Sequence, residues 1–537
     1  MKHLESNGSE GATTASAAVS DLPVTAVGVA DGEISGLRGA NVWDLAVQRA
    51  ALTPEAVLAY DERGRVLTFG ELPAAAERAA AALSHRGIGP GSVVSWQLAT
   101  SLETVVLLTA LSRLGAVQNP LIMMLREQET RFICAQARTE LLVVPPEFRG
   151  FAHGEMAERI AADLPRLDVL LINGALPEAD PSDLPPVSDE PEVRWLFYTS
   201  GTTSEPKGAK HTDEGLLAAS DAFCNAIRPE PTDRIAGLAP IAHVGGVLLV
   251  ISALQSGCSL ILTDVFEPRA TSRLLHELDV TLGGIGVPFA NALMAQQRAT
   301  PDERLFPHMR AFLMGGAPRP ATLHGEVKDT LGGVGTVSGY GLTECPFASW
   351  ARPTDDERHL ALSDGLPGPG TEIRIVGPDE SLVAPGVAGE LRLRAPQLMK
   401  GYVDSNLDVA AFDEHGFFRT GDLATVDEEG YVTITGRIKD VIIRNMENIS
   451  AREVEEHLAR CAGVAEVAVV GRPDPVTGEH VCAVVVPRDP GAPPTLESLT
   501  ADLLEFGLNK RKLPQVLEVV ESLPRNAMGK ILKRELR

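Results

Sequence analysis

The chain has 537 residues, a formal net charge of −24 and a sequence pI near 5.0. An acidic surface of this kind repels nucleic-acid backbones and anionic membrane surfaces alike, so we expect no nucleic-acid partner. Hydrophobic residues make up 44% of the chain, which is too long for one compact core, and this predicts a large unit with a smaller one beside it.

The N-terminal residues 1–36 predict a flexible tail, because they are rich in Gly, Ala, Ser and Thr and show no apolar periodicity. They have no basic start followed by an apolar run, so they do not resemble a secretory signal. The six cysteines are scattered, without a C-x-x-C pair or the histidine spacing of zinc sites. We therefore expect a cytoplasmic protein with reduced cysteines.

Short apolar runs alternate with helical segments from about residue 40 onward. The runs Ser92–Trp96, Glu140–Val144 and Asp168–Ile172 predict strands, and the Ala- and Leu-rich segment Leu72–Leu83 predicts a helix. This alternation is typical of an α/β domain with largely parallel sheets.

The segment from Thr199 to Gly208 has the chemistry of a phosphate-binding loop. It follows an apolar strand that ends near Tyr198, and it combines hydroxyls, glycines and one lysine. Glycines let backbone N–H groups approach phosphate oxygens, the hydroxyls donate, and Lys207 supplies positive charge. The segment does not match G-x-x-x-x-G-K-[ST], because Lys207 follows Pro206. Taken alone, a cluster of this type is more often a solvated Ser/Thr/Gly turn.

Val244 to Leu262 carries no charge and is long enough to suggest a transmembrane helix. Polar residues and glycines, among them Gln255 and Gly257, interrupt it. We predict instead a buried helix, a glycine-containing turn and a strand at Ser259–Thr263, and no transmembrane segment.

The pattern changes near residue 430, where Gly430–Gly436 predicts a hairpin strand and Arg437–Asp440 a charged connector. A small α+β unit is expected beyond the connector. Its predicted helices and strands are Ala451–Cys461, Val464–Gly471, His480–Pro487 and Leu496–Phe506. We place the domains at 1–36 for the tail, 37–436 for the large domain and 437–537 for the C-terminal domain.

Four more segments follow the phosphate loop in order: Ser338–Glu344, Arg419–Leu423, Gly436–Asp440 and Asn526–Lys530. Together, at these separations, the five resemble the motifs of the acyl-adenylate-forming superfamily, which includes acyl-CoA synthetases, adenylation domains of peptide synthetases and beetle luciferases. The resemblance covers essentially residues 40 to 537. Within the superfamily, Glu447–Glu455 is most similar to fatty-acid, aryl-acid and alicyclic-acid CoA ligases.

The resemblance implies a fold and an activity. The fold is a large α/β domain of fused subdomains, with parallel sheets and a small β-barrel-like part, followed by a small mobile C-terminal α+β domain. The activity is ATP-dependent acid–CoA ligation, with ATP, Mg²⁺ and coenzyme A as cofactors and co-substrates and a small carboxylic acid as partner. Whether the chain is a monomer or a homodimer stays open.

The resemblance also implies a nucleotide site. Tyr340 would stack on the adenine, Asp422 would accept hydrogen bonds from both ribose hydroxyls, and Arg437 would support the same sugar. The residues implied to bind ATP or AMP are Thr199, Ser200, Gly201, Thr202, Thr203, Lys207, Gly316, Ala317, Gly339, Tyr340, Gly341, Thr343, Asp422, Arg437 and Lys530.

Further roles follow from the same resemblance. Glu344 would hold Mg²⁺, with Thr199 as a weaker ligand. Lys530 would neutralise charge as the acid attacks the α-phosphate, and Lys207 and His243 are the other implied catalytic residues. The implied hinge is Lys439, which would let the C-terminal domain admit Lys530 for the first step and withdraw it for the second. The implied acyl-pocket residues are His243, Gly315 and Gly339, and the implied thiol-tunnel residues are His243 and Met446.

Two positions depart from the superfamily pattern. Ser204 stands where the phosphate loop usually has glycine, a small change that adds a donor. Met446 stands where many relatives have glycine on the path of the thiol, and its bulk bears on the thioester step.

Three other functions stay open beside the acid–CoA ligase. A stand-alone adenylation enzyme that loads a carrier protein is disfavoured for amino acids, because Ile241–His243 lacks the aspartate that would pair with an α-amine. A non-catalytic acyl-adenylate binder predicts loss of Lys530, Glu344 or Asp422, yet all three are present. A luciferase-like oxidation is possible in principle. The acyl group, whether fatty, alicyclic or aryl, is not specified by the sequence.

Overall fold

The structure is a computed structural model that describes residues 36–188, 192–199, 205–445, 447–525 and 530–537. Nearly all of the predicted N-terminal tail therefore lies outside the described residues, as do Ser200, Gly201, Thr202 and Thr203 of the phosphate loop, Ser204, and Met446.

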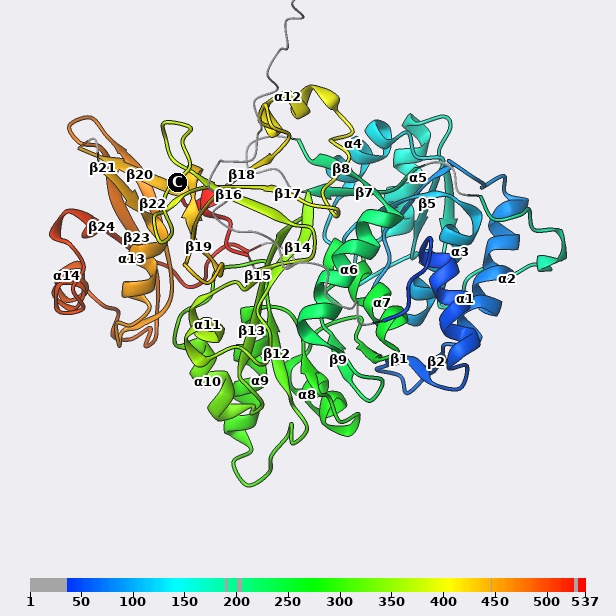
Figure 1. The fold of residues 1–537 in the computed structure, drawn as a ribbon, viewed down its shortest axis with the longest axis horizontal. Helices are drawn as coiled ribbons and strands as arrows, with labels where there is room; N and C mark the ends of the chain where they lie inside the picture. Colours follow the sequence, from blue (N-terminus) through cyan, green and yellow to red (C-terminus); the bar gives the residue numbers. More distant parts are fainter. Residues whose placement is uncertain (1–35, 189–191, 200–204, 446, 526–529) are drawn as a thin grey trace, which may run out of the picture.

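Two large sheets form the body of the molecule (Figure 1). In the described residues the first sheet runs in the order β6-β5-β3-β4-β7-β8 and is parallel except for the β7–β8 pair. Its strands are β3 (Val93–Trp96), β4 (Val117–Pro120), β5 (Leu141–Val144), β6 (Asp168–Leu171), β7 (Val193–Thr199) and β8 (Lys207–Thr212). β7 and β8 flank the phosphate-loop segment, so the loop joins two hydrogen-bonded strands.

The second sheet runs in the order β15-β14-β13-β12-β11-β9-β10-β1-β2 within the described part of the chain, and it is parallel from β13 to β1. Its strands are β1 (Val57–Asp61), β2 (Val66–Thr68), β9 (Arg234–Gly237), β10 (Ser259–Leu262), β11 (Leu282–Gly283), β12 (Ala311–Met314), β13 (Thr336–Leu342), β14 (Cys345–Trp350) and β15 (Leu366–Pro367). Parallel strands are buried on both faces, which explains their continuous apolar runs.

Helices cover both sheets and share one large core. Apolar residues of α1, α2, α3, α6 and α7 pack with strand residues of both sheets, including the buried Trp96 and Trp195. The helices of this region are α1 (Val42–Leu52), α2 (Glu71–His85), α3 (Leu102–Leu114), α4 (Glu127–Ala137), α5 (His153–Asp163), α6 (Asp213–Ile227), α7 (Val244–Ser256), α8 (Pro268–Glu277), α9 (Val287–Ala299), α10 (Leu323–Thr330), α11 (Glu357–Leu362) and α12 (Asp408–Ala411).

The uncharged stretch from Val244 folds as predicted. It forms the buried helix α7, a turn at Gly257 with φ +82°, and the strand β10. A glycine suits this turn, because a left-handed backbone strains other residues. Across the described residues, no helix has both the length and the apolar character that a bilayer crossing requires.

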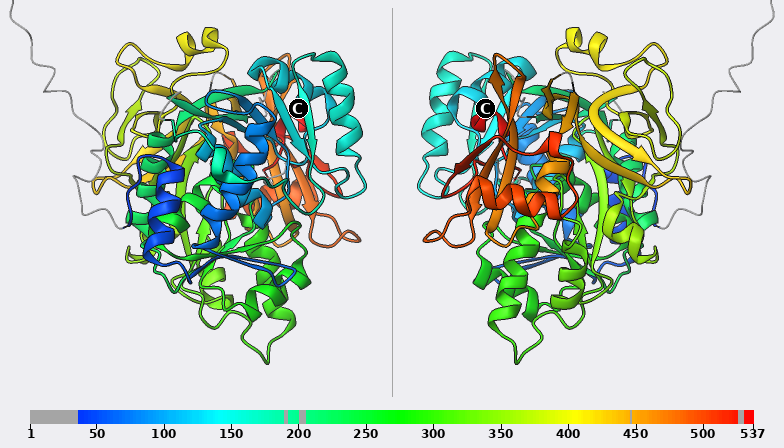
Figure 2. Two further views of the ribbon diagram at one scale, coloured as in Figure 1. Left: turned by 90° about the vertical axis from the view of Figure 1, so that its right-hand side faces the viewer. Right: turned by 90° about the vertical axis from the view of Figure 1, so that its left-hand side faces the viewer.

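Two smaller sheets follow along the chain. In the described residues, β16 (Glu372–Val376), β17 (Gly389–Arg394), β18 (Phe418–Val426) and β19 (Val432–Arg437) form an antiparallel sheet, which stands where a small β part was expected. The last sheet has the order β21-β20-β23-β22, with β24 paired to β23, and lies at one end of the molecule (Figures 1 and 2). The elements of this last part are β20 (Val441–Arg444), β21 (Glu447–Ser450), α13 (Ala451–Leu458), β22 (Val464–Asp474), β23 (Gly478–Pro487), α14 (Leu496–Glu505) and β24 (Val516–Val519).

The predicted α/β class with a smaller C-terminal α+β part is confirmed, and each predicted strand or helix appears within a few residues of its expected bounds. Between the last two sheets the chain passes through one short 3₁₀ turn, Ile438–Asp440. The domain limits at 36 and 436 and the mobility of the C-terminal part stay predictions.

Candidate active site

A cavity of about 930 Å³ opens between the two large sheets, the β16–β19 sheet and the C-terminal part. Most of the predicted site residues line it, although they come from segments far apart in the sequence. These are Thr199, Lys207, His243, Gly315, Gly316, Gly339, Tyr340, Gly341, Thr343, Glu344, Asp422, Arg437, Lys439 and Lys530. Ala317 does not line the cavity.

Asp422 is the centre of one polar group in the cavity. The Tyr340 hydroxyl donates to its Oδ2 over 2.7 Å, and Arg437 Nε lies 2.9 Å from its Oδ1. Asp422 and Arg437 are cross-strand partners on β18 and β19, so the sheet register brings this pair together. Burial and the charge of Asp422 raise the pKa of Tyr340 well above its usual value, which keeps the hydroxyl a donor. The carboxylate is buried and holds two donors at once.

The backbone around Asp422 is fixed by Thr420. The Thr420 hydroxyl donates to the Leu391 carbonyl over 2.6 Å and accepts the Asp422 N–H over 3.0 Å. Gly421 between them has φ +68°, a conformation that favours glycine. This geometry turns the Asp422 side chain into the cavity, and it explains why the sequence has Thr, Gly and Asp in succession.

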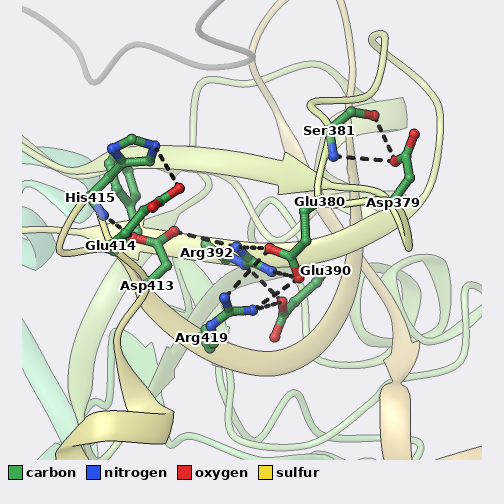
Figure 3. Close-up of polar contacts among 10 residues, drawn as sticks. Asp379, Glu380, Ser381, Glu390, Arg392, Asp413, Glu414, His415 and Arg419 are labelled. Carbon is green, nitrogen blue, oxygen red and sulfur yellow. Dashed lines mark hydrogen bonds and ion pairs between the residues drawn. The ribbon is translucent and has the colours of Figure 1, made fainter.

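An ion-pair network lies behind this turn (Figure 3). Arg392 is 5% exposed and contacts Glu380, Glu390 and Asp413 at 2.7, 2.8 and 3.4 Å. Arg419, which lines the cavity, contacts the same Glu380 at 3.2 Å. The two guanidinium groups lower the pKa of Glu380 to about 2. Arg392 and Arg419 are cross-strand partners on β17 and β18. The carboxylates that they share lie between the two guanidinium groups and hold the start of β18 in place.

Glu344 and Lys207 both lie close to Tyr402. The Tyr402 hydroxyl donates to Glu344 Oε1 over 2.8 Å, and Lys207 Nζ lies 5.7 Å from the centre of the Tyr402 ring. Burial and the charge of Glu344 raise the pKa of Tyr402. Thr199 joins this group, since its hydroxyl donates to the Lys207 carbonyl over 3.4 Å.

This second group fits a hard divalent cation that arrives with phosphates. In the described residues, no three His, Cys, Asp or Glu side chains gather into a metal site. Among the described residues, Tyr402 donates to one oxygen of Glu344, and Glu344 lines the cavity. A carboxylate in this position suits Mg²⁺, which keeps most of its coordination for phosphate oxygens and water.

His243 caps the N-terminus of α7. The Gly245 N–H donates to its Nδ1 over 3.2 Å, so the neutral ring carries its proton on Nε2. Burial lowers the pKa of His243 to about 4, which keeps the ring neutral at physiological pH. The tight first turn of α7 depends on Gly246, where a Cβ would lie 2.2 Å from the Pro240 carbonyl oxygen.

Positive charge gathers where the C-terminal part meets β19. Burial and then the charges of Arg437 and Lys439 lower the pKa of Lys530 to about 8. Burial and Arg437 also lower the pKa of Lys439. Three cations lie near Asp422, while the neighbouring Asp440 pairs with Arg537, and this makes a local preference for an anion in a chain whose overall charge is −24.

The segment that follows Lys530 is anchored by two sets of contacts. Lys533 forms a 2.7 Å ion pair with Glu455 of α13, and both side chains are largely buried. Arg537 donates to the Lys439 carbonyl over 2.9 Å and to Asp440 over 2.7 Å. These contacts tie the end of the chain to both the C-terminal core and the connector.

Several cavity residues were not anticipated from the sequence. Tyr402, Arg419 and Thr420 organise the two polar groups, and Phe347 and Trp350 form part of the apolar lining. Arg419 and Thr420 belong to the segment Arg419–Leu423, so its resemblance to the superfamily could have pointed to them. Tyr402, Phe347 and Trp350 are single aromatic residues without a spacing pattern, and their role depends on the packing of distant strands.

Comparison with known protein families gives two matches. The model described as AMP-binding enzyme matches residues 47–403, and the model described as AMP-binding enzyme C-terminal domain matches residues 453–530. Among characterised proteins, the chain is 30% identical over 518 residues to the medium-chain fatty-acid–CoA ligase of Escherichia coli K12, covering 94% of this chain and 91% of the relative. It is 35% identical over 507 residues to a feruloyl-CoA synthase of Amycolatopsis, covering 93% and 99%.

Solved structures agree with these matches. ATP-bound MatB from Rhodopseudomonas palustris superimposes with a TM-score of 0.84 at 29% identity, covering 93% of this chain and 98% of that one. The o-succinylbenzoate CoA synthetase MenE from Bacillus subtilis, in complex with its acyl-adenylate intermediate, superimposes with a TM-score of 0.78 at 26% identity, covering 93% and 99%.

Proposed function

The chain belongs to the AMP-binding enzymes, and from this membership we propose that it is an ATP-dependent acid–CoA ligase. In the first step a carboxylate oxygen of the acid attacks the α-phosphorus of ATP, the bond to the bridging oxygen breaks, and pyrophosphate leaves. In the second step the thiolate of coenzyme A attacks the acyl carbon, AMP leaves, and acyl-CoA forms.

One observation carries the proposal. Lys530, close to the end of the chain, lies in the same cavity as Asp422 and Arg437 of the β16–β19 sheet and as Glu344 of the second large sheet. A cation that neutralises charge between a carboxylate and a phosphate must stand beside both, in a site shielded from water. The burial that lowers the Lys530 pKa is the sign of such a site.

The roles of the nucleotide residues stay proposals, and the contacts support them. Each oxygen of Asp422 has one donor beside it, Arg437 at Oδ1 and Tyr340 at Oδ2. A carboxylate oriented in this way can also accept hydrogen bonds from two neighbouring ribose hydroxyls. Tyr340 lines the cavity, and its ring would stack on the adenine. Lys207 lies near Tyr402, the residue that holds Glu344, and Thr199 contacts the Lys207 backbone; the phosphates of ATP would lie at this group.

We propose Glu344 as the protein ligand of Mg²⁺, with Thr199 as a weaker one. Mg²⁺, when bound, neutralises charge on the phosphates and aligns pyrophosphate as a leaving group. Tyr402 orients the Glu344 carboxylate through its 2.8 Å hydrogen bond.

The thiol site is proposed at His243. Its neutral ring has a donor at Nε2, which suits a position beside the acyl carbonyl or the approaching thiol. The cavity also has an apolar portion at Leu121, Ile122 and Met124, and Met124 is 54% exposed, so this portion reaches the surface. Such a passage fits the long pantetheine arm of coenzyme A. Met446 lies outside the described residues, and its effect on this passage stays an open prediction.

The hinge role of Lys439 is likewise a proposal. Lys439 lies in the short connector between two sheets, and Arg537 holds its carbonyl. Rotation of the C-terminal part would break that bond and withdraw Lys530, which clears the cavity for the thiol.

The decisive experiment measures pyrophosphate release from ATP and Mg²⁺ with a panel of carboxylic acids, each with and without coenzyme A. We expect acid-dependent release that accelerates with coenzyme A and yields an acyl-CoA. Acid-dependent release at the same rate with and without coenzyme A would favour a carrier-protein acceptor instead. Absence of release with every acid, by a folded enzyme that binds ATP, would contradict the proposal.

Glu344→Gln tests the metal site. The neutral amide keeps the size of the side chain but binds Mg²⁺ poorly, so we expect the Mg²⁺ concentration for half-maximal pyrophosphate release to rise by about 100-fold. Tyr402→Phe is expected to raise it less, about 10-fold, because it removes orientation only. Glu372→Gln is the control, since Glu372 pairs with Arg394 outside the cavity. An unchanged Mg²⁺ requirement for Glu344→Gln would remove Glu344 from the metal site.

A further inference from the structure

One wall of the cavity consists of glycines and apolar side chains. A Cβ built on Gly315 would lie 3.2 Å from the Gly339 carbonyl oxygen and 3.7 Å from Ile285, and one built on Gly339 would lie 2.5 Å from the Trp350 ring. Ile285, Gly315, Gly339 and Trp350 therefore lie in contact, in that order, along one surface of the cavity. We call Gly245, Ile285, Gly315, Gly339, Phe347 and Trp350 the ring wall, and all six line the cavity.

The ring wall carries no charge among its described residues. Among the described residues, the charged side chains of the cavity are those of the two polar groups, the cations Arg419, Lys439 and Lys530 near Asp422, and the exposed Glu129 and Arg525. A second carboxylate on the acyl group would thus be buried against the ring wall without a cation, which is strongly unfavourable. The wall disfavours dicarboxylic acids.

Aromatic rings close the wall from behind. The Phe347 and Trp350 rings meet edge to face at 5.2 Å, and Phe223 of α6 packs on them at 5.6 and 5.3 Å. Phe223 is fully buried in the main core. A long alkyl chain cannot extend past these rings without displacing the core. Its remaining route is the apolar portion at Leu121 and Ile122, which the pantetheine arm would need in the second step, so the site also disfavours long-chain fatty acids.

The position of Phe347 is strained. Its φ is +52°, in the left-handed region that favours glycine. The neighbouring hairpin closes tightly, because a Cβ on Gly341 would lie 2.5 Å from the Phe347 nitrogen. Strain of this kind is retained mainly where a side chain serves a functional site. Here it sets a ring against Trp350 at the edge of the cavity.

Gly339 packs directly on the Trp350 ring, whereas Gly245 leaves open space in front of this aromatic group. A Cβ on Gly245 would meet only the His243 ring, at 3.5 Å, so the first turn of α7 borders open cavity. Flat backbone surfaces on one side and ring edges on the other suit a planar ring, which gains edge-to-face contacts.

Given the ligase function proposed above, we infer that the acyl site selects an uncharged aryl monocarboxylic acid, with the ring against Phe347 and Trp350. Long-chain fatty acids and dicarboxylic acids are poor substrates.

The test compares kcat/KM for pyrophosphate release with benzoate, cinnamate, dodecanoate and butanedioate at fixed ATP and Mg²⁺. We expect the better aryl acid to exceed dodecanoate and butanedioate by about 100-fold. If dodecanoate or butanedioate equals it, the inference is wrong while the ligase function stands. If no acid of any class supports release, the ligase function itself fails.

Gly245→Leu places a side chain in front of the ring wall. We expect kcat/KM for the aryl acid to fall by about 100-fold while the KM for ATP changes less than about 2-fold. Gly325→Leu is the matched control, because Gly325 also lies near the start of a helix, α10, and is exposed with nothing within 4 Å of its built Cβ. Unchanged aryl-acid kinetics in a folded Gly245→Leu enzyme would overturn the inference.

Phe347→Gly provides a second variant that the backbone tolerates. Glycine suits the positive φ, so the strand is kept while the ring is removed. We expect the ratio of kcat/KM for the aryl acid to that for dodecanoate to fall by about 10-fold or more. Arg228→Gly relieves a similar φ of +49° away from the cavity and controls for backbone effects. An unchanged ratio in Phe347→Gly would exclude Phe347 from selectivity.

Discussion

Lys530→Ala is expected to slow adenylate formation by about 1,000-fold, the scale at which removal of one transition-state donor acts in a closed site. The substitution removes the cation that stands with Arg437 beside Asp422. The folded structure should be little affected, because Lys533 and Arg537 anchor the same segment independently. Single-turnover pyrophosphate release with saturating acid and ATP is the measurement.

The second half-reaction separates a catalytic from a structural effect. Lys530→Ala should react a supplied acyl adenylate with coenzyme A at nearly the rate of the unaltered enzyme, since the proposed rotation of the C-terminal part withdraws Lys530 in that step. Lys510→Ala, an exposed lysine that does not line the cavity, is the control for loss of charge. Equal losses in both half-reactions would contradict the alternation of the C-terminal part.

The pH profile gives an independent readout of the same lysine. A lysine whose pKa is lowered to about 8 carries its charge below that pH and loses it above. The kcat/KM for ATP, which reports the free enzyme, should therefore decline as pH rises through about 8. The kcat profile, which reports the enzyme with bound substrates, should decline at a higher pH than kcat/KM, because bound phosphates favour the charged form of Lys530. Lys530→Arg keeps its charge throughout, and its kcat/KM should lack the decline near pH 8 even if its overall rate is lower.

Asp422→Asn is expected to weaken ATP binding by about 10- to 100-fold, the range for losing a hydrogen bond to a charged group. The amide keeps the shape of the side chain, but its NH₂ group cannot accept from Arg437, Tyr340 or a ribose hydroxyl. The KM for ATP should rise by this factor, and calorimetric titration with ATP should show the same loss.

The matched control for this substitution is Asp233→Asn. Asp233 is also buried and paired, with Arg310 Nη2 at 2.9 Å, but it lies outside the cavity. Both variants should lose stability in thermal unfolding, whereas only Asp422→Asn should change the affinity for ATP. A similar ATP affinity in the two variants would mean that Asp422 is structural.

Much of the architecture was predictable because it depends on local patterns. The apolar runs of β3 and β5 are the mark of buried parallel strands, and the polar and glycine residues after Val244 indicated the turn and strand that follow α7. Element ends shifted by a few residues, as at α13, which ends at Leu458 rather than Cys461. Capping contacts set such ends, and these depend on neighbours that a local pattern does not contain.

The site was predictable where chemistry is concentrated in short motifs. Asp422, Arg437, Glu344 and Lys530 were implied by the resemblance of five such motifs, in order, to one superfamily, and all four line one cavity. Tyr402 and Phe347 were missed, since each is a single aromatic residue whose importance arises from a partner on another segment.

By itself, the sequence determined the α/β class, the order of elements and the chemical types that a phosphate-binding and carboxylate-activating site requires. These follow from side-chain periodicity and from glycine, hydroxyl and charge patterns within a few residues. Tertiary structure alone decided which residues meet: the register that pairs Asp422 with Arg437, the burial that lowers the Lys530 pKa, and the packing of Phe223 behind Phe347 and Trp350. Each of these depends on contacts between distant segments, and so does the shape of the acyl site.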